Sequence, residues 1–282
     1  HQTYKHWELI VINDGSTDST ESIVQEYIDA GYPIIYHYQK NKGLSYSRNK
    51  AIELSQGDYI ALIDHDDVWL PDKLAKQVIA MQRNEDHVLC CAGIIEIDRM
   101  GRELRRYNSK NNSGYMFDTL LKQFDIYVPT AFLRKSILQK SGLRFDERVS
   151  ASEEYCLFMQ LAVNHKFLVL PDILAKYRIH DESLSSKSIS KWADEREYIL
   201  NLICNDNAGI EKKYRVEFKE AYARARYYRV RYYVSIGNKL KAIALMSQNL
   251  FINWRYMILF LILLLPTLFW NFIHKIKTRR EI

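Results

Sequence analysis

Short apolar runs alternate with amphipathic stretches over the first two-thirds of the chain. The apolar runs predict β-strands, and the stretches between them, with apolar residues three or four positions apart, predict α-helices. The expected strands are residues 7–12, 34–38, 59–63, 88–97 and 127–133, and the expected helices are residues 19–30, 45–54, 71–83 and 115–123. Pro71 suits the first turn of its helix, where a missing N–H costs nothing. This alternation is typical of βαβ units over a mainly parallel sheet.

The pattern changes near residue 185. Residues 191–204, 214–233 and 239–250 have helical periodicity, and Gly237 separates the last two. Tyrosine and arginine alternate over residues 223–231, which could indicate contact with RNA. A helical hairpin packed on the preceding domain, with the arginine stems lying along apolar surface, explains the same pattern without a nucleic-acid partner, and we favour it.

The end of the chain is apolar and then basic. Residues 257–269 are uncharged and apolar except at Pro266 and Thr267, and residues 274–280 are mostly basic. With its flanks the apolar run approaches 18 residues, the short limit for a spanning helix. We therefore expect membrane attachment rather than a buried core helix, and divide the chain into residues 1–186, 187–250 and 251–282.

The topology of such an attachment stays open. A single span beneath a cytoplasmic catalytic domain would place the basic tail outside, against the tendency of positive charge to remain inside. A re-entrant or interfacial segment broken at Pro266 would keep both sides in the cytoplasm. In either case we expect a membrane-associated protein with its catalytic domain on the cytoplasmic face.

Composition indicates the class of protein but does not identify its binding partner. Of the 282 residues, 48% are hydrophobic and 26% charged, which is the balance of a folded protein. The net charge of +6 would suit nucleic acid, an anionic membrane or a phosphorylated substrate alike. The four cysteines form no CxxC pair, and Cys90 and Cys91 lie in an apolar run. Buried reduced thiols are the favoured interpretation, and they suit a cytosolic domain.

Three carboxylates follow the expected strand at 59–63, namely Asp64, Asp66 and Asp67. Ligands of open α/β sheets bind beyond the carboxyl ends of the strands. Carboxylates clustered there repel one another unless a cation neutralises them, and oxygen ligands suit Mg²⁺ or Mn²⁺. A solvated loop in which Asp67 or Asp72 caps the next helix is the alternative.

A further carboxylate follows the first expected strand. Residues 7–12 run into Asn13, Asp14 and Gly15, and the glycine permits a tight turn. Capping of the following helix accounts for Ser16 and Asp18, but it leaves Asp14 unexplained. We expect the Asp14 side chain to point toward a ligand.

Five motifs, taken together, resemble glycosyltransferase family 2 of the bacterial surface-polysaccharide type. They are residues 11–18 (VINDGSTD), 41–49 (NKGLSYSRN), 57–67 (GDYIALIDHDD), 152–157 (SEEYCL) and 177–185 (YRIHDESLS). They occur in the family's order and cover roughly residues 1–186. The resemblance implies the GT-A fold, a Rossmann-like mixed α/β sheet, here with a C-terminal helical extension.

The resemblance also implies roles for single residues. Asp14 would contact the nucleotide base, and Arg48 would help to bind the nucleotide. Asp64 and Asp66 look like the family's DxD motif, with Asp64 near the ribose and Asp66 on a metal-bound diphosphate. His180 resembles the residue of the closing motif beside the donor diphosphate. The implied cofactor is Mn²⁺ or Mg²⁺, held by Asp66, Asp64 and His180.

Glu153 and Glu154 stand where the family usually has Glu-Asp, whose second member acts as general base. The aspartate is replaced here by the longer glutamate, so either Glu153 or Glu154 could take the proton from the acceptor hydroxyl. Without the other motifs, two acids in the first turn of a helix would simply favour its dipole. The resemblance implies a single displacement with inversion at the anomeric carbon.

The beginning of the chain departs from the family. His1 is not an initiator methionine, and the first expected strand starts almost at once. The family begins with a strand and helix that would precede Gln2, so we expect one βα unit of about 30 residues to be missing.

The expected activity is a hexosyltransferase-like transfer from a nucleotide-sugar, with UDP the family's commonest nucleotide. A saccharide or lipid-linked saccharide is the expected acceptor, with membrane contact through the C-terminal segment and no nucleic acid. A metal-dependent nucleotidyltransferase and a catalytically inactive, membrane-attached scaffold remain the alternatives. A processive synthase is disfavoured, because Gln248, Trp254 and Arg255 do not reproduce a QxxRW motif.

Overall fold

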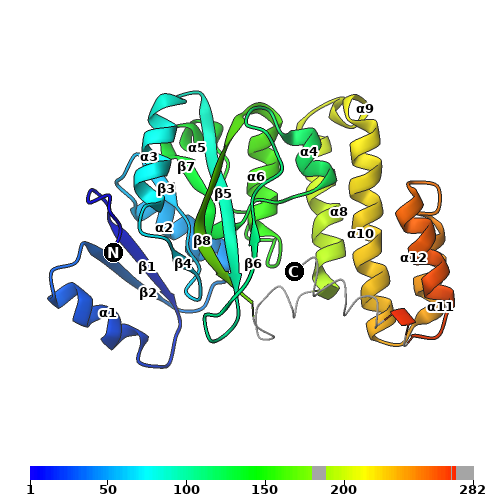
Figure 1. Ribbon diagram of the computed structural model, residues 1–282, viewed down its shortest axis with the longest axis horizontal. Helices are drawn as coiled ribbons and strands as arrows, with labels where there is room; N and C mark the ends of the chain where they lie inside the picture. Colours follow the sequence, from blue (N-terminus) through cyan, green and yellow to red (C-terminus); the bar gives the residue numbers. More distant parts are fainter. Residues whose placement is uncertain (180–188, 268, 271–282) are drawn as a thin grey trace. The chain divides into compact units, whose positions relative to one another are not determined.

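The computed structural model describes residues 1–179, 189–267 and 269–270 (Figure 1). The chain divides into two compact units, His1–Asp181 and Glu182–Ile282. The first unit contains β1 (Leu9–Asp14), α1 (Thr20–Asp29), β2 (Ile34–Gln39), α2 (Leu44–Leu54), β3 (Tyr59–Ala61), β4 (Val68–Trp69), α3 (Lys73–Arg83), β5 (His87–Ile97), β6 (Glu103–Tyr107), α4 (Phe117–Lys122), the 3₁₀ helix η1 (Val128–Thr130), β7 (Phe132–Arg134), α5 (Lys135–Ser141), α6 (Glu153–Asn164) and β8 (Lys166–Arg178).

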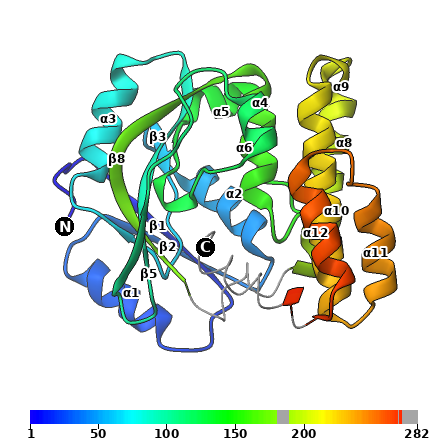
Figure 2. The same cartoon turned by 45° about the vertical axis from the view of Figure 1, so that its right-hand side comes forward.

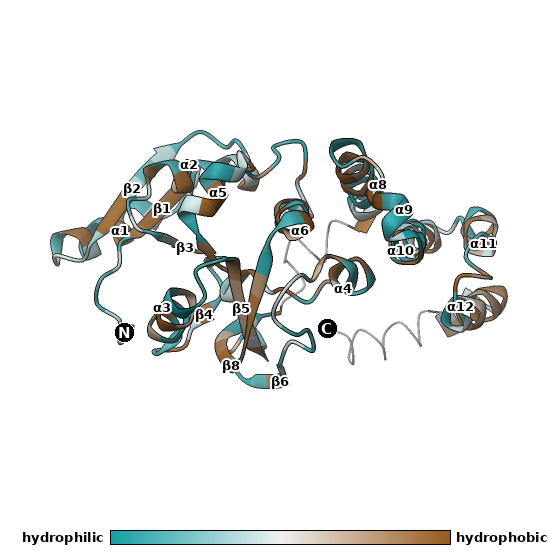
Figure 3. Ribbon diagram, turned by 90° about the horizontal axis from the view of Figure 1, so that it is seen from above, coloured by the Kyte–Doolittle hydropathy of each residue, from teal (hydrophilic) through white to brown (hydrophobic). Residues whose placement is uncertain are grey.

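Strand β5 is the centre of the larger sheet. It pairs in parallel with β8 along one edge, and with β7 and β6 in antiparallel fashion along the other. All its residues are buried, as expected for a continuous apolar run covered on both faces. Figures 1 and 2 show β5 and β8 as neighbouring long strands, and Figure 3 shows the apolar colour along β5. Strands β1 and β2 form a separate parallel pair.

The expectation of a mainly parallel sheet is wrong. Among the described strands of the larger sheet, only the β5–β8 pair is parallel, while β3–β7, β5–β7, β5–β6 and β4–β8 are antiparallel. Strand β6 explains part of this, because it returns directly beside β5 after a short turn. Strand direction depends on such connections and on pairings far apart in the chain, which the alternation of apolar runs and helices does not reveal. The fold is therefore a mixed α/β sheet.

The other local differences between the predicted and the observed elements occur at prolines. Helix α3 begins at Lys73, so Pro71 precedes the helix instead of lying in its first turn, and its carbonyl accepts a hydrogen bond from Thr3 N at 2.8 Å. The single strand expected at 127–133 is divided into η1 and β7 around Pro129. Strand β8 was not predicted; Pro171 lies where its pairing with β5 becomes irregular, between Val169 and Ile173. A proline interrupts the ladder because it has no N–H to donate.

The core beside α3 contains a fully buried lysine. Lys73 Nζ donates to Gln77 Oε1 at 2.7 Å and lies 4.2 Å from the centre of the Trp69 ring. Burial lowers the Lys73 pKa to about 7. Three cysteines, Cys90, Cys91 and Cys156, are also buried, and all four cysteines are free thiols. The expected buried reduced thiols are thus found at three positions, while Cys204 is half-buried.

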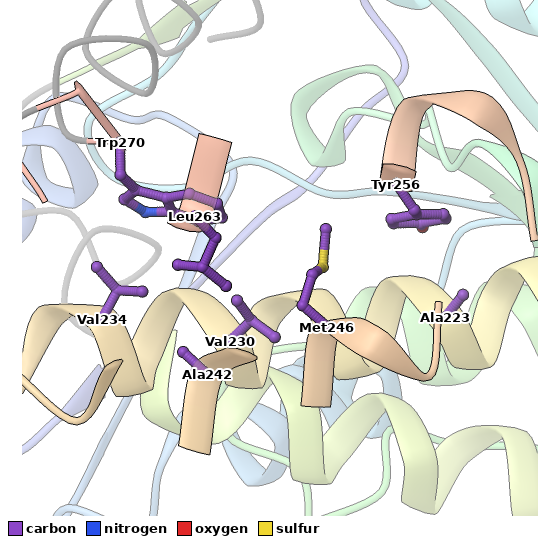
Figure 4. Close-up of a cluster of buried hydrophobic side chains, with 8 residues drawn as sticks. All are labelled: Ala223, Val230, Val234, Ala242, Met246, Tyr256, Leu263 and Trp270. Carbon is purple, nitrogen blue, oxygen red and sulfur yellow. The ribbon is translucent and has the colours of Figure 1, made fainter. Parts of the chain in front are cut away.

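The second unit is helical, with α8 (Ile189–Asp206), α9 (Ile210–Lys213), α10 (Arg215–Ser235), α11 (Lys239–Ser247) and α12 (Trp254–Leu264). Figure 4 shows the cluster that joins α10, α11, α12 and Trp270. Arg229 of the tyrosine- and arginine-rich helix contacts Asp194 at 2.5 Å and Glu197 at 3.0 Å, both on α8. This arginine therefore serves packing between helices.

The apolar run expected at 257–269 lies largely in α12. Tyr256, Leu263 and Trp270 from this region are buried in the cluster of Figure 4. Across the described portion of the chain, no helix is both long and apolar enough to cross a bilayer. The basic residues 274–280 lie outside the described residues.

Candidate active site

The loop between β3 and β4 carries the three predicted aspartates. Asp67 N donates to the Asp64 carbonyl at 3.1 Å, which closes a tight turn around His65 and Asp66. Asp64 and Asp66 are half-buried, whereas Asp67 is buried. The run of acids is thus folded into a single turn at the end of β3.

Asp67 and Arg178 fasten this loop to β8. Asp67 Oδ1 accepts a hydrogen bond from Arg178 N at 2.8 Å, and the Arg178 guanidinium donates to the Asp66 carbonyl at 2.8 Å and to the Asp98 carbonyl at 3.0 Å. Burial raises the Asp67 pKa to about 7, with the nearby charges of Asp64 and Asp66 adding to the effect. Sequence reasoning missed this clamp, although both residues lie within the quoted motifs.

Arg48 connects the loop to helix α6. It lies on α2 and is 8% exposed. Its Nη2 donates to Asp64 Oδ1 at 2.9 Å, while Nη1 lies 3.5 Å from Glu153 Oε1 and 3.8 Å from Glu154 Oε2. These three acids raise the Arg48 pKa despite its burial, so the guanidinium stays charged. This one cation therefore gathers three of the other predicted residues.

The two glutamates differ in access. Both lie in the first turn of α6, where the helix dipole favours negative charge. The Glu153 side chain is 5% exposed, whereas that of Glu154 is 25% exposed. Of the two glutamates, Glu154 is the one that combines contact with Arg48 and appreciable access to a bound molecule.

Asp14 organises a different loop. Its Oδ1 accepts hydrogen bonds from Lys42 N and Gln39 Nε2, and its Oδ2 accepts one from Gly43 N, each at 2.8 Å. These bonds lower the Asp14 pKa although partial burial opposes the change. Gly43 has φ +89°, a left-handed conformation that favours glycine.

Gly15 and Gln39 complete this region. A Cβ at Gly15 would lie 3.0 Å from Asn41 N, so the turn after β1 needs glycine for close approach to residues 41–43. Gln39 is buried and donates to Asp14 and, at 3.1 Å, to Ser47 Oγ. Its Oε1 has no hydrogen-bond partner among the described residues. Sequence reasoning did not single out Gln39, whose only signal was its place at the end of an apolar strand.

The carboxylates fit a divalent cation held together with a substrate. Among the residues that the structure describes, no three His, Cys, Asp or Glu side chains form a complete metal site. Mg²⁺-type sites commonly use one or two carboxylates and complete the shell with substrate phosphates and water. Asp66 and Asp64 suit that role, and the repulsion that helps raise the Asp67 pKa would be relieved by a cation. His180, the third expected ligand, lies outside the described residues.

Comparison with known proteins points to one family. The sequence profile of Glycosyl transferase family 2 matches residues 1–142. The putative teichuronic acid biosynthesis glycosyltransferase TuaG of Bacillus subtilis is 46% identical over 199 residues, which cover 68% of this chain and 73% of TuaG. The Escherichia coli protein WfgD, named as a UDP-Glc:alpha-D-GlcNAc-diphosphoundecaprenol beta-1,3-glucosyltransferase, is 26% identical, over 74% of this chain and 80% of WfgD.

The fold has solved counterparts. TarS from S. aureus, in complex with UDP-GlcNAc, matches with a TM-score of 0.61 at 19% identity, over 90% of this chain and 76% of that one. This likeness shows the GT-A fold. The chain spans 29% and 62% of the length of two other curated relatives, both uncharacterized glycosyltransferases.

Proposed function

The chain belongs to glycosyltransferase family 2, and on that premise we propose that it transfers a sugar from a UDP-sugar to a hydroxyl of a lipid-linked saccharide. Resemblance in sequence and fold supports the reaction class. The nucleotide, the acceptor and the stereochemistry are our proposals.

The position of Arg48 carries the proposal. Its guanidinium contacts Asp64, in the loop that would hold the donor, and Glu153 and Glu154, at the start of the helix that would meet the acceptor. A transferase must hold its donor and its acceptor within bonding distance. A buried cation shared by the two carboxylate motifs keeps the donor-side and acceptor-side residues close to each other.

On the donor side, two loops would bind the nucleotide. Asp14 fixes the backbone of Lys42 and Gly43, so that loop is rigid before the donor arrives. Asp64, oriented by Arg48, would approach the ribose. A bound Mn²⁺ or Mg²⁺, held by Asp66 and Asp64 with the diphosphate, would stabilise negative charge on the departing nucleoside diphosphate.

On the acceptor side, we assign the general base to Glu154. It is more exposed than Glu153, and Arg48 lies close enough to fix its direction. Glu154 takes the proton from the acceptor hydroxyl while that oxygen bonds to the anomeric carbon. The bond from the anomeric carbon to the diphosphate oxygen breaks, and its electron pair leaves with UDP. One displacement of this kind inverts the anomeric configuration.

The relatives support a lipid-linked acceptor in surface-polysaccharide synthesis. The WfgD name specifies a UDP-sugar and a diphosphoundecaprenol-linked sugar, and the TuaG name specifies a cell-surface polysaccharide. The extension of these chemistries to this chain rests on family membership.

Thermal unfolding of the chain with UDP, dTDP or GDP, with and without Mn²⁺, tests the donor site. Ligand at 100 times its Kd should add about 2.7 kcal/mol of stability. We expect UDP with Mn²⁺ to raise the Tm, Asp66→Ala to remove the rise, and Asp29→Ala, on the exposed end of α1, to retain it. A rise of the Tm with dTDP or GDP instead would assign that nucleotide, in place of UDP, to the donor.

Absence of any nucleotide-dependent shift would contradict the donor-site assignment and favour the inactive scaffold. Transfer to a synthetic lipid-linked saccharide, with the product's anomeric configuration read by NMR, tests the remainder. A retained configuration would overturn the single displacement.

A further inference from the structure

Helix α12 exposes a continuous apolar face. Trp254, Leu261 and Leu264 are 65%, 56% and 50% exposed. Met257, Ile258 and Leu265 are exposed beside them. These six positions are spaced three or four residues apart or are adjacent, so they form one stripe along the helix. A helix at a water-facing surface would normally carry polar side chains there.

The opposite face of α12 is already used. Tyr256 and Leu263 point into the cluster that contains Val230 and Met246 (Figure 4). The helix is therefore held by its own unit through one face, and the stripe is directed away from that cluster. A contiguous exposed apolar patch indicates an interaction surface.

The stretch of sequence that contains the stripe carries an excess of positive charge. From residue 239 to residue 280 the sequence contains seven lysines and arginines and no aspartate or glutamate, a formal charge of +7. Three of these cations are described: Lys239, Lys241 and Arg255. Lys239 Nζ bonds the Leu265 carbonyl at 2.6 Å, which places a cation at the end of the stripe. The remaining four are Lys275, Lys277, Arg279 and Arg280.

This combination identifies the partner. A second copy of the chain would bring the same excess of positive charge to the interface, and the two would repel one another. An anionic lipid surface supplies both an apolar layer for the stripe and negative charge for the lysines and arginines. Trp254, at the start of the helix, is of a residue type enriched at membrane interfaces.

We propose that α12 lies in the plane of an anionic membrane, with the stripe from Trp254 to Leu265 in the boundary between headgroups and acyl chains. The inner face keeps its contacts with α10 and α11, so binding needs no rearrangement of the second unit. The proposal rests on the exposed stripe and on charge, and is independent of the reaction assigned to the first unit.

Co-sedimentation of the full chain with vesicles tests the proposal. The vesicles are phosphatidylcholine alone, or phosphatidylcholine with about a third phosphatidylglycerol. We expect binding to the anionic vesicles, weaker binding to phosphatidylcholine, and partial release by salt because exposed charges are screened. Leu261→Glu should lower the partition coefficient at least tenfold, because it places a charge in the acyl boundary.

Val216→Glu is the matched control, since Val216 is 65% exposed on α10 of the same unit and lies outside the stripe. It should bind as the unmodified chain does. Leu261→Gln, with circular dichroism to establish folding, separates loss of apolar contact from added charge, and it should also weaken binding.

Equal binding by Leu261→Glu and Val216→Glu would overturn the proposal, as would no binding of the unmodified chain to anionic vesicles. Light scattering without lipid tests whether a second copy of the chain covers the stripe. A dimer that Leu261→Glu dissociates would assign the stripe to a second copy instead.

Discussion

Arg48 donates a 2.9 Å hydrogen bond to Asp64, so a buried cation of α2 orients the first acid of the β3–β4 loop. The same guanidinium lies near Glu153 and Glu154. The residues proposed for the donor and for the acceptor thus depend on one side chain for their charge balance.

We expect Arg48→Gln to destabilise the protein by about 3 kcal/mol or more at pH 7 and to abolish transfer. Removal of one partner from a buried ionic group leaves uncompensated charge, here on three acids. Urea unfolding measures the loss. Arg144→Gln removes the exposed pair with Glu147 and should cost less than about 1 kcal/mol. Equal stability of the two variants would contradict the central role of Arg48.

The choice between the two glutamates can be decided by kinetics. Glu154→Gln should lower kcat roughly 10²- to 10⁴-fold with the Kd for the donor nearly unchanged, because it removes only the proton acceptor. Glu153→Gln should alter stability more than kcat, since Glu153 is buried beside Arg48. Steady-state transfer assays and nucleotide thermal shifts measure both quantities. The reverse ranking of kcat would assign the base to Glu153.

Asp14→Ala should weaken nucleotide binding by loosening the backbone at Lys42 and Gly43. The hydrogen bonds lower the Asp14 pKa below its ordinary value of 3.8. The stability that these hydrogen bonds add to the folded protein is therefore complete above pH 3.8 and is lost as the pH falls through the folded-state pKa of Asp14. The Tm difference between the unmodified chain and Asp14→Asn should be constant at neutral pH and narrow in acid. A difference that widens in acid would contradict this account.

Glu96 should make the stability of the protein depend on pH in the opposite direction. It is 4% exposed on β5, and burial raises its pKa to about 7, with Arg105 opposing the rise. Stability should fall as the pH rises from about 4.5 to about 7, because the unfolded chain releases this proton first. Glu96→Gln lacks this dependence and should exceed the unmodified chain at pH 8 by on the order of 1–3 kcal/mol.

Thermal melts at pH 5 and pH 8 measure the Glu96 effect. Glu103→Gln, on the exposed strand β6, is the control and should show no comparable gain at pH 8. A Glu96→Gln variant that is less stable than the unmodified chain at pH 8 would contradict the prediction.

The sequence by itself determined several helices, the central strand and the family. Helices α2 and α3 and strand β5 follow from apolar periodicity within a few residues. The family follows from short motifs such as residues 11–18 and 57–67, which can be recognised without any knowledge of distant contacts.

Only the tertiary structure decided how those motifs meet. Arg48 forms ion pairs with both Asp64 and Glu153, and Arg178 binds the Asp67 carboxylate and the Asp66 carbonyl from more than 100 positions away. Which strands pair in antiparallel fashion, and which residues of α12 face outward, likewise needed the structure. Periodicity records which face of an element is apolar, but hydrogen bonds, charge pairs and burial depend on which elements pack together. The packing partners depend on contacts between segments far apart in the chain, which local periodicity does not reveal.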